Sequence, residues 1–175
     1  MTNKIAVIYK SRYGSTKKYA EWIAQETGAD LLEHSQAKIN DLIKYDTIVY
    51  GGNLHAGKID GKELIVNNFE KIKEKKLIIF WVGSSPVDEI ATEKLLKTLP
   101  ENIQPKINLF GLRGAFNFKK LKGVDKLMVK IFLWVLKSKK VEKLSKDDKG
   151  FIASCEKPTD LVDRNTIKPI IEAIK

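Results

Sequence analysis

Short runs of apolar, β-branched residues alternate along the chain with stretches whose apolar positions recur every three or four residues. The short runs predict strands at about residues 4–9, 30–34, 46–51, 77–83 and 106–115. The periodic stretches predict helices at about residues 15–27, 61–75, 87–99, 122–138 and 160–174. Alternating strands and helices are typical of βαβ units, which form a parallel sheet covered by helices on both faces. We therefore expect an α/β fold.

Polar turns rich in glycine and hydroxyl residues follow the first, third and fourth of these strands. The turns are residues 11–16, 51–58 and 83–86. Open parallel sheets bind ligands outside the carboxyl ends of their strands, where the strand order reverses. In a doubly wound, five-stranded sheet of order 2-1-3-4-5, the three strands lie side by side at that point. We expect the three turns to converge on one crevice.

The turn after the first strand has the features of a phosphate-binding loop. It reads Ser11-Arg12-Tyr13-Gly14-Ser15-Thr16 and leads into a helix. The first N–H groups of a helix have no intrahelical acceptor and lie at the positive end of the helix dipole, so they attract anions. The hydroxyls of Ser11, Ser15 and Thr16 add donors, and Gly14 lets the backbone approach closely. Alternatively, the hydroxyl side chains only cap the helix.

Two nucleotide-binding motifs are incomplete in the sequence. The first turn has one glycine where a dinucleotide-binding fingerprint needs three, which argues against NAD. Residues 52–58 have the glycine spacing and the lysine of a P-loop, but Ile59 stands where a Ser or Thr would ligate Mg²⁺. We therefore expect neither NAD nor a nucleoside triphosphate in the crevice. We identify no catalytic side chain and no metal ligands.

Length and cysteine content limit the class of protein to which the chain can belong. The 175 residues suffice for one well-packed domain, and no linker or repeat divides them, so we expect a single domain over residues 1–175. Cys155 is the only cysteine, which excludes an intrachain disulfide and favours a reducing, cytoplasmic location. The N-terminal residues lack the apolar stretch of a secretory signal.

The net charge of +10 is concentrated in residues 117–149, which contain eleven lysines and four acidic residues. We expect a basic helical insertion here. On a helical wheel, one side of the helix expected at 122–138 carries Lys122, Asp125, Lys126, Lys130 and Lys137, and a wide apolar face carries Leu127, Met128, Ile131, Phe132, Trp134 and Val135. Such a helix can lie in the interface of an anionic membrane, or it can pack on the sheet with its lysines solvated. Bulky aliphatic residues interleave the lysines and no nucleic-acid motif is present, so we do not expect nucleic-acid binding.

With these turns in place, the sequence resembles the flavodoxin-like family. The first turn is similar to the family's phosphate loop, roughly S/T-x-T-G-x-T, with matches at Ser11, Gly14 and Thr16 and with Tyr13 in place of the middle threonine. Residues 45–52 before a His/Gly loop, and the later stretches 114–116 and 125–130, resemble the menaquinone-dependent, FMN-containing protoporphyrinogen oxidases of bacteria.

The resemblance implies FMN as the cofactor, with its phosphate on residues 11–16 and its ring between the loops 52–58 and 83–88. The cofactor-binding residues that it implies are Ser11, Arg12, Tyr13, Gly14, Ser15, Thr16, Gly52, Asn53, Leu54, His55, Ala56, Gly57, Ser84, Ser85 and Pro86. His55 is either a solvated loop residue or a contact of the flavin edge or of an incoming carboxylate. Because the chain is basic, we expect a flavin potential above that of an acidic electron carrier.

Three functional hypotheses remain open from the sequence. The resemblance implies an FMN-dependent oxidoreductase that passes electrons from a porphyrinogen-type donor to a quinone at the inner face of a membrane. The negatively charged propionates of such a donor are expected to be attracted by the lysines of residues 117–149. The alternatives are a flavodoxin-type electron carrier with a protein partner and no organic substrate, and a flavin-free binding domain. The sequence does not indicate an oligomeric state.

Overall fold

The computed structural model describes residues 3–84 and 86–175, apart from the side chains of residues 141, 146 and 147. The chain divides into two compact units. The first, which we call the sheet unit, consists of Met1–Gly114 and Val162–Lys175. The second, the helical unit, is Ala115–Leu161. The prediction of one domain with a basic insertion at about 117–149 stays a prediction.

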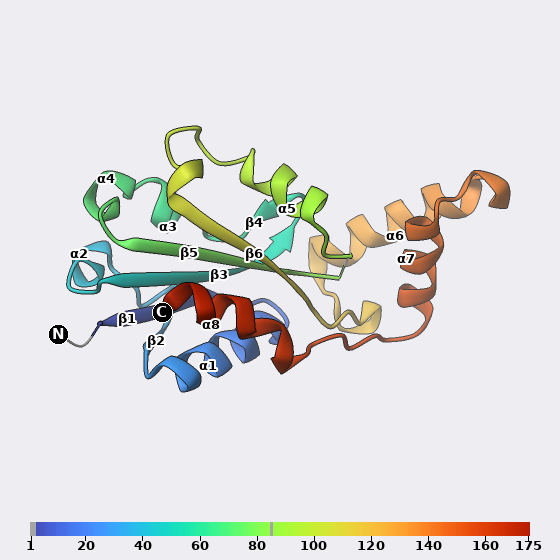
Figure 1. Cartoon of the computed structure of the whole chain (residues 1–175). Coiled ribbons are helices and arrows are strands. Elements are labelled where there is room, and N and C mark those ends of the chain that lie inside the picture. The colour runs from blue at the N-terminus through green and yellow to red at the C-terminus, as the bar shows by residue number, and fades with distance from the viewer. Residues whose placement is uncertain (1–2, 85) are drawn as a thin grey trace. The chain divides into compact units, whose positions relative to one another are not determined.

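The sheet unit is built on five parallel strands in the order β2-β1-β3-β5-β6. The strands are β1 (Ile5–Lys10), β2 (Asp30–Glu33), β3 (Thr47–His55), β5 (Lys76–Gly83) and β6 (Ile107–Arg113). The two-residue strand β4 (Lys58–Ile59) pairs antiparallel with the end of β3. If β4 is left out of the count, the path is the expected order 2-1-3-4-5, and the α/β fold is confirmed (Figure 1).

Helices cover both faces of the sheet (Figure 1). They are α1 (Ser15–Thr27), α2 (Ile39–Leu42), α3 (Glu63–Val66), α4 (Phe69–Ile72), α5 (Glu89–Leu96) and α8 (Lys168–Ile174), with 3-10 turns η1 (Gln104–Lys106) and η4 (Arg164–Ile167). The bounds of α1 agree with the prediction. The long helix expected at 61–75 is wrong: α3 and α4 are single turns, separated at Asn67 and Asn68. Asparagine favours turns because its side chain bonds to nearby backbone, as Asn68 does to the Leu64 carbonyl at 3.0 Å.

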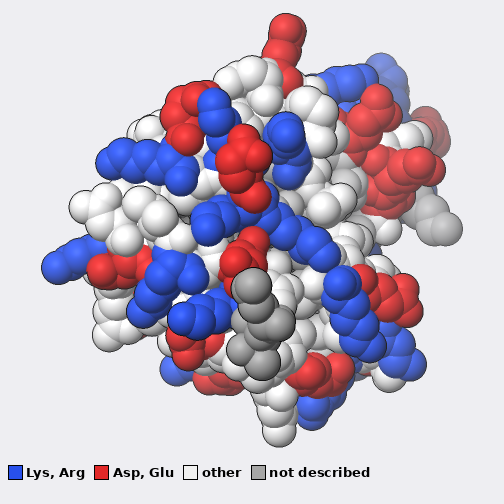
Figure 2. All heavy atoms as spheres, turned by 60° about the vertical axis from the view of Figure 1, so that its left-hand side comes forward, with Lys and Arg blue, Asp and Glu red and all other residues white. Residues whose placement is uncertain are grey.

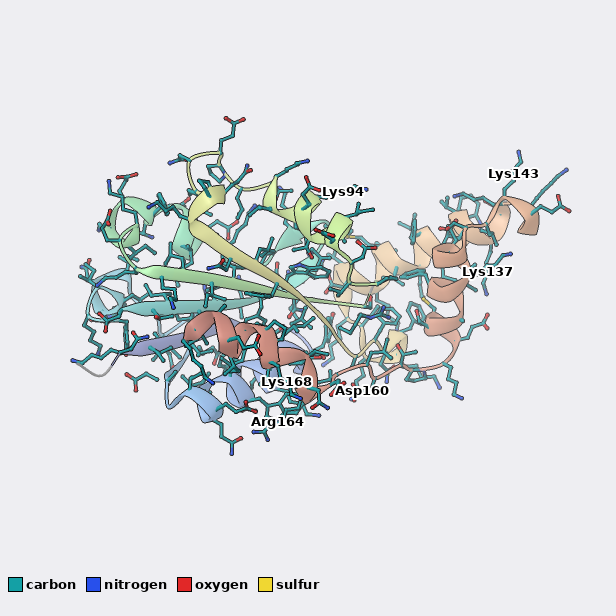
Figure 3. All side chains as sticks on the ribbon, in the orientation of Figure 1. Lys94, Lys137, Lys143, Asp160, Arg164 and Lys168 are labelled. Carbon is teal, nitrogen blue, oxygen red and sulfur yellow. The ribbon has the colours of Figure 1, made fainter. Side chains whose placement is uncertain are left out.

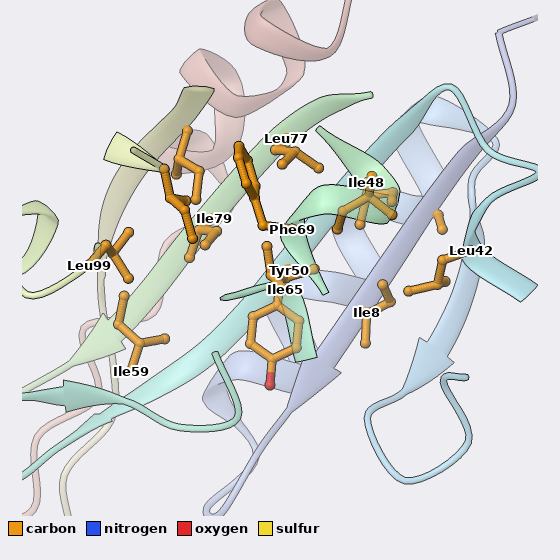
Figure 4. Close-up of a cluster of buried hydrophobic side chains, with 14 of the residues drawn as sticks. Ile8, Leu42, Ile48, Tyr50, Ile59, Ile65, Phe69, Leu77, Ile79 and Leu99 are labelled. Carbon is orange, nitrogen blue, oxygen red and sulfur yellow. The ribbon is translucent and has the colours of Figure 1, made fainter. Parts of the chain in front are cut away.

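Successive residues of each central strand point into two separate apolar clusters. Ile8, for example, packs in the cluster with α3, α4 and α5, whereas Val7 packs in the cluster with α1 and α8. Figure 4 shows the first cluster, in which Tyr50, Ile59 and Ile79 are buried together. A parallel sheet buried on both faces reads as a continuous apolar run, which is why the strands were visible in the sequence.

The helical unit contains α6 (Gly123–Ser138) and α7 (Lys146–Glu156), with 3-10 turns η2 (Phe118–Lys120) and η3 (Val141–Lys143). The ring of Phe151 in α7 lies 5.2 Å from that of Phe132 in α6, in an edge-to-face arrangement. Lys137 of α6 also forms an ion pair of 3.3 Å with Glu156 of α7 (Figure 3). The helix α6 matches the expected one at 122–138. The helix α7 was not expected, although Ser145 and Asp148 form a capping box at its start.

Charges of both signs are interspersed on the side of the molecule that carries the N-terminus. Figure 2 shows lysine and arginine side chains beside aspartate and glutamate over this surface. Ion pairs such as Lys73–Glu70, at 2.9 Å, contribute to the pattern. The excess of lysines in residues 117–149 is therefore a local feature of the sequence and not a uniform property of the surface.

Candidate functional site

The turn between β1 and α1 presents a helix N-terminus that is suited to an anion. Gly14, at the N-cap of α1, has φ 97°, and no atom lies within 4 Å of the place where its Cβ would be. The N-cap makes no side-chain hydrogen bond, and the first turn of α1 contains no acidic residue. The backbone N–H of Gly14 donates to Ser11 Oγ at 3.1 Å, which closes the turn. The N-cap is thus a glycine, which has no side chain to cap the helix, and the alternative that the hydroxyl side chains only cap the helix stays open.

Asn53 of β3 fixes the position of this turn. Its Oδ1 accepts a hydrogen bond of 2.7 Å from the Thr16 hydroxyl and one of 3.4 Å from the backbone N–H of Arg12. Thr16 is fully buried, so its hydroxyl hydrogen serves this contact. Thr16 thus ties α1 to β3, and its expected role as a phosphate donor stays a prediction.

A second link runs from the turn to the residue after β4. Arg12 Nε donates to Asp60 Oδ2 at 2.6 Å, with the carboxylate side chain only 15% exposed. The Asp60 carbonyl accepts a hydrogen bond of 2.9 Å from the Tyr50 hydroxyl. Since that hydroxyl has one hydrogen, His34 Nδ1, at 3.1 Å from it, carries its own hydrogen and donates to the Tyr50 oxygen.

The protonation states of His34 and Tyr50 preserve this chain of hydrogen bonds. Burial, with the negative charges of Glu63 and Asp60, raises the pKa of Tyr50 well above its ordinary value, so the hydroxyl stays protonated. Burial and the positive charge of Lys10 lower the pKa of His34, and Glu63 opposes them. His34 is therefore a neutral donor near pH 7.

The expected loop at 52–58 is wrong in its conformation, because strand β3 continues through His55. Gly52 pairs with Lys10 on one side and with Trp81 on the other. The turn is confined to Ala56 and Gly57, whose φ values are 48° and 75°. Positive φ at both central residues is the geometry of a tight hairpin turn whose twist matches its strands. Gly52, Asn53, Leu54 and His55 therefore lie on a strand, and Ala56 and Gly57 form the tip.

The third stretch follows β5, the strand next to β3. Ser84 and Pro86 are exposed there, and Ser85 lies outside the described residues. Leu54 of β3 approaches this stretch, since its Cδ2 lies 3.4 Å from the place of a Gly83 Cβ. The turns after β1, β3 and β5 therefore lie at the carboxyl ends of three neighbouring strands, as the sequence predicted.

Three further polar residues near these turns were not expected from the sequence. Asp60 holds Arg12, and the side chains of Trp81 and Arg113 each carry a buried nitrogen without a hydrogen-bond partner among the described residues. An arginine that ends an apolar strand is an unusual signal, and it was available in the stretch Phe110-Gly111-Leu112-Arg113. The other two depend on long-range contacts that the sequence does not reveal.

A family model of the flavodoxin domain matches residues 6–143, which include the phosphate turn, β3 and β5. The chain belongs to the flavodoxin domain family. FMN is the cofactor of this family, so the expectation of an FMN-binding redox protein is confirmed at the level of the family. No curated protein matches the sequence.

Several solved structures are similar to this flavodoxin domain protein. The Trp repressor binding protein of Bacillus subtilis is 15% identical, with a TM-score of 0.48, over 63% of this chain and 83% of that one. A flavoprotein of Lactobacillus acidophilus in complex with FMN is 17% identical, with a TM-score of 0.42, over 63% and 92% of the two chains. The two-electron reduced flavodoxin of Megasphaera elsdenii is 14% identical, with a TM-score of 0.43, over 62% and 85%.

The residues of this flavodoxin domain fit the phosphate of FMN. The open space at Gly14 and the uncapped start of α1, free of acidic residues in its first turn, suit a dianion. Ser11, Gly14 and Ser15, with the first N–H groups of α1, are the groups that would hold it. Within the described part of the chain, no helix is long and apolar enough to cross a membrane. The described residues also contain no cluster of three or more His, Cys, Asp or Glu suited to a metal.

Proposed function

We propose that this protein is an FMN-dependent oxidoreductase that transfers electrons from a porphyrinogen-type donor to a quinone at a membrane surface. FMN, when bound, supplies two-electron redox chemistry that no side chain provides. Each turnover takes two electrons and two protons from the donor and converts one quinone to its quinol. The membership of the flavodoxin domain family supports the cofactor. The resemblance of the sequence to bacterial protoporphyrinogen oxidases supports the donor and the acceptor.

The sheet unit supplies binding and orientation for this chemistry. The start of α1 binds the phosphate, and Asn53 holds that turn against β3 through Thr16. The ion pair between Arg12 and Asp60 braces the same turn against the hairpin of β3 and β4. These contacts position the cofactor along the carboxyl ends of the strands, where open α/β sheets bind their ligands.

The observation that carries the membrane part of the proposal is the exposed apolar face of α6. Trp134 is 73% exposed and Val124 is 70% exposed, although both are large and apolar. The same face also exposes Leu127, Met128, Ile131, Phe132 and Val135. Large exposed apolar patches in soluble domains mark surfaces that bind something. An electron carrier that meets only proteins in solution does not need such a surface.

The charges beside this face favour an anionic lipid surface as its partner. On the helical wheel, Lys126, Lys130 and Lys137 lie together beside Trp134 and Leu127. Lysines at the border of an apolar face bind lipid phosphates while the apolar side chains enter the headgroup boundary, with tryptophan at that depth. Each lysine near an anionic surface contributes about 1 kcal/mol. A quinone dissolved in the bilayer then lies close to the bound protein.

The activity is tested with the purified, FMN-loaded protein, protoporphyrinogen IX and menadione as the quinone, without oxygen. We expect porphyrin fluorescence to rise only when FMN and menadione are both present. If the porphyrinogen is not oxidised, but FMN on the protein is reduced by a flavodoxin reductase and reoxidised by a second redox protein, the electron carrier is the correct function. If the protein binds no FMN, the flavin-free alternative holds.

The membrane contact is tested by co-sedimentation with lipid vesicles. We expect binding to vesicles that contain phosphatidylglycerol and little binding to pure phosphatidylcholine. Replacing Trp134 with serine should weaken the binding. The matched control is Ile90→Ser, because Ile90 of α5 is also an exposed apolar side chain, at 64%. Equal binding by both variants and the parent protein would contradict the contact through α6.

A further inference from the structure

The parallel sheet ends in β2 on one side and in β6 on the other, and the two edges differ in their protection (Figure 1). An open edge can pair with another chain, so proteins usually shorten their edge strands or place charges on them. Strand β2 has four residues and carries Asp30 and Glu33. Strand β6 has seven residues and no charge before Arg113, its last residue. The edge at β6 is therefore the one open to a partner.

A groove of about 530 Å³ between α5 and β6 leaves this edge accessible. On the side of β6, three consecutive residues line it, Leu109, Phe110 and Gly111. Successive side chains of a strand point to opposite faces, so a groove that touches three in a row runs along the edge of the strand. Leu109 and Phe110 are only half-buried there.

The outer edge of β6 presents the backbone groups of every second residue. In a parallel pair, alternate residues direct both their N–H and their C=O toward the neighbouring strand. Gly114, which directly follows β6, donates its N–H to the Gly83 carbonyl of β5 at 2.7 Å, so the even-numbered residues face β5. The odd-numbered residues, which point their backbone groups away from β5, are Ile107, Leu109, Gly111 and Arg113.

Two of these outward groups already have partners within the chain. The Ile107 N–H donates to the Gln104 carbonyl, and the Arg113 carbonyl accepts a hydrogen bond of 2.7 Å from the Tyr19 hydroxyl. The other outward groups have no hydrogen bond to any residue that the structure describes. They are the Ile107 carbonyl, both groups of Leu109 and of Gly111, and the Arg113 N–H.

An antiparallel copy of the same strand pairs every one of these free groups. In the register that places Phe110 opposite Phe110 of a second copy, Leu109 lies opposite Gly111 and the two exchange both hydrogen bonds. Arg113 lies opposite Ile107 and donates its N–H to that carbonyl. The reverse bond is not needed, because both of its groups already have partners. A shift by two residues leaves the N–H of Arg113 or of Leu109 unpaired, so the edge is complementary to itself in this register.

The side chains suit the same register. Phe110, which packs against the cluster of α1 and α8, meets its own copy at a non-hydrogen-bonded pair, where Cα atoms lie about 4.5 Å apart. Aromatic pairs at such positions stabilise a sheet. On the face of α5, Leu109 lies opposite Gly111, which has no side chain in the way.

The charges along the edge also favour a second copy. Arg113, the only charged residue of β6, follows Leu109 and Gly111 on the face of α5. The pairing brings it beside Ile107 of the other copy. The groove along that edge is lined by three acidic residues of that copy, Asp88, Glu89 and Glu93. A cation of each copy thus meets an acidic groove of the other.

We propose that β6 pairs with β6 of a second copy, antiparallel about a two-fold axis at Phe110, and joins two sheets into one in a homodimer. The proposal goes beyond the function proposed above and does not depend on the electron donor. One strand from each copy is a small contact, so we expect a Kd for the dimer of about 10–100 µM.

Disulfide trapping in the FMN-loaded protein tests the register. Cys155, the only cysteine, is first replaced with serine. In that background Phe110→Cys should form a disulfide-linked dimer, because the two cysteines face each other at the axis within disulfide reach. The matched control is Asn108→Cys, since Asn108 is more exposed but lies about 14 Å from its own copy in this register. We expect trapping of Phe110→Cys to be at least about tenfold faster.

Amide hydrogen exchange of the unsubstituted, FMN-loaded protein tests the pairing itself. As the protein concentration rises through the Kd, the N–H groups of Leu109 and Gly111 should exchange more slowly, while the sedimentation coefficient rises toward that of a dimer. The control is the Leu31 N–H of β2. It also points away from the sheet, because His34 donates to the Tyr9 carbonyl and so places the even-numbered residues toward β1. Its exchange should not change.

Leu109→Pro removes an outward N–H without removing a bond to β5, so it should abolish the dimer and leave FMN affinity unchanged. A protein that remains monomeric at about 1 mM overturns the proposal. Equal trapping of Phe110→Cys and Asn108→Cys overturns it too, because that result indicates random collision. Slow exchange of Leu109 and Gly111 already in the monomer would show that the chain covers this edge itself. A dimer in which these two amides exchange as in the monomer would place the contact elsewhere.

Discussion

The Thr16 hydroxyl donates a hydrogen bond of 2.7 Å to Asn53 Oδ1, and this bond joins two segments that are 37 residues apart. It connects the first turn of α1 to the far half of β3. Both residues belong to the set expected to bind the cofactor. The bond shows that part of this set shapes the site by holding its loops together.

Removing the Thr16 hydroxyl should weaken FMN binding. Thr16→Val keeps the shape of the buried side chain but leaves Asn53 Oδ1 with only the longer contact to the Arg12 N–H. We expect a loss of about 1–2 kcal/mol in the free energy of unfolding and a Kd for FMN raised about tenfold. Flavin fluorescence quenching and thermal unfolding measure the two effects.

The control for this substitution is Thr27→Val. Thr27 lies at the other end of α1, and its hydroxyl donates to the Ile23 carbonyl at a similar 2.7 Å. It should lower stability without a change in FMN affinity. Equal effects of the two substitutions on FMN binding would contradict a specific role of the bond between Thr16 and Asn53.

Replacing Gly14 with alanine should destabilise the phosphate turn through the backbone alone. A Cβ at Gly14 meets no atom within 4 Å, but φ is 97°. We expect a cost of about 1–2 kcal/mol for holding alanine in this conformation, and weaker FMN binding. The control is Gly150→Ala within α7, where the added Cβ also meets no atom within 4 Å. We expect this substitution to stabilise the folded protein by about 0.5–1 kcal/mol. Chemical denaturation checks both, and effects of the same sign would contradict the explanation.

Replacing Asp60 with asparagine, whose amide oxygen still accepts a hydrogen bond from Arg12 and keeps the turn braced, should strengthen the binding of FMN. The Asp60 carboxylate lies 2.6 Å from Arg12 and offsets the one arginine of the phosphate turn. Removing one negative charge near the phosphate should lower the Kd for FMN about fivefold, since a charge interaction there is worth about 1 kcal/mol. Riboflavin, which lacks the phosphate, should bind as before.

A matched change of charge elsewhere separates this local effect from net charge. Glu93→Gln breaks an ion pair of 2.7 Å with Lys97 on α5. It alters the net charge by the same amount and should not change FMN affinity. Tighter binding of riboflavin by Asp60→Asn, or of FMN by Glu93→Gln, would show that the phosphate is not the group concerned.

His34 should make stability depend on pH between neutral and mildly acidic conditions. Its pKa is lowered from the ordinary value of 6.5 in the folded protein, so the unfolded chain takes up a proton at a higher pH than the folded one. Its contribution is present above pH 6.5 and is lost as the pH falls toward the folded pKa. Urea unfolding from pH 7.5 to 5 should show this loss in the parent protein and in His55→Gln, and a smaller loss in His34→Gln. An unchanged slope in His34→Gln would assign the pH dependence to other groups.

The strands of this fold could be predicted because burial on both faces produces unbroken apolar runs, as in Ile5–Lys10 and Lys76–Gly83. The extension of β3 through His55 could not, because polar and glycine residues there read as a loop. Gly52 and Asn53 extend the strand by pairing with Trp81 and Val82 of β5, which is a tertiary contact, and Leu54 and His55 pair with the two-residue strand β4 across the hairpin turn. The sequence also predicted the phosphate turn from local chemistry, and it missed Asp60, because the partner of Arg12 lies 48 residues away.

The last residues of the chain complete the sheet unit after the whole helical unit has been made. Val162–Lys175 belongs with Met1–Gly114, and Ile167, Ile170 and Ile174 are buried in the cluster that contains α1. During synthesis, residues 115–161 therefore leave the ribosome while α1 covers this face of the sheet without α8. A nascent chain that pauses before Ile167 exposes the part of this apolar face that α8 covers, so chaperone binding should last until α8 has packed on the sheet.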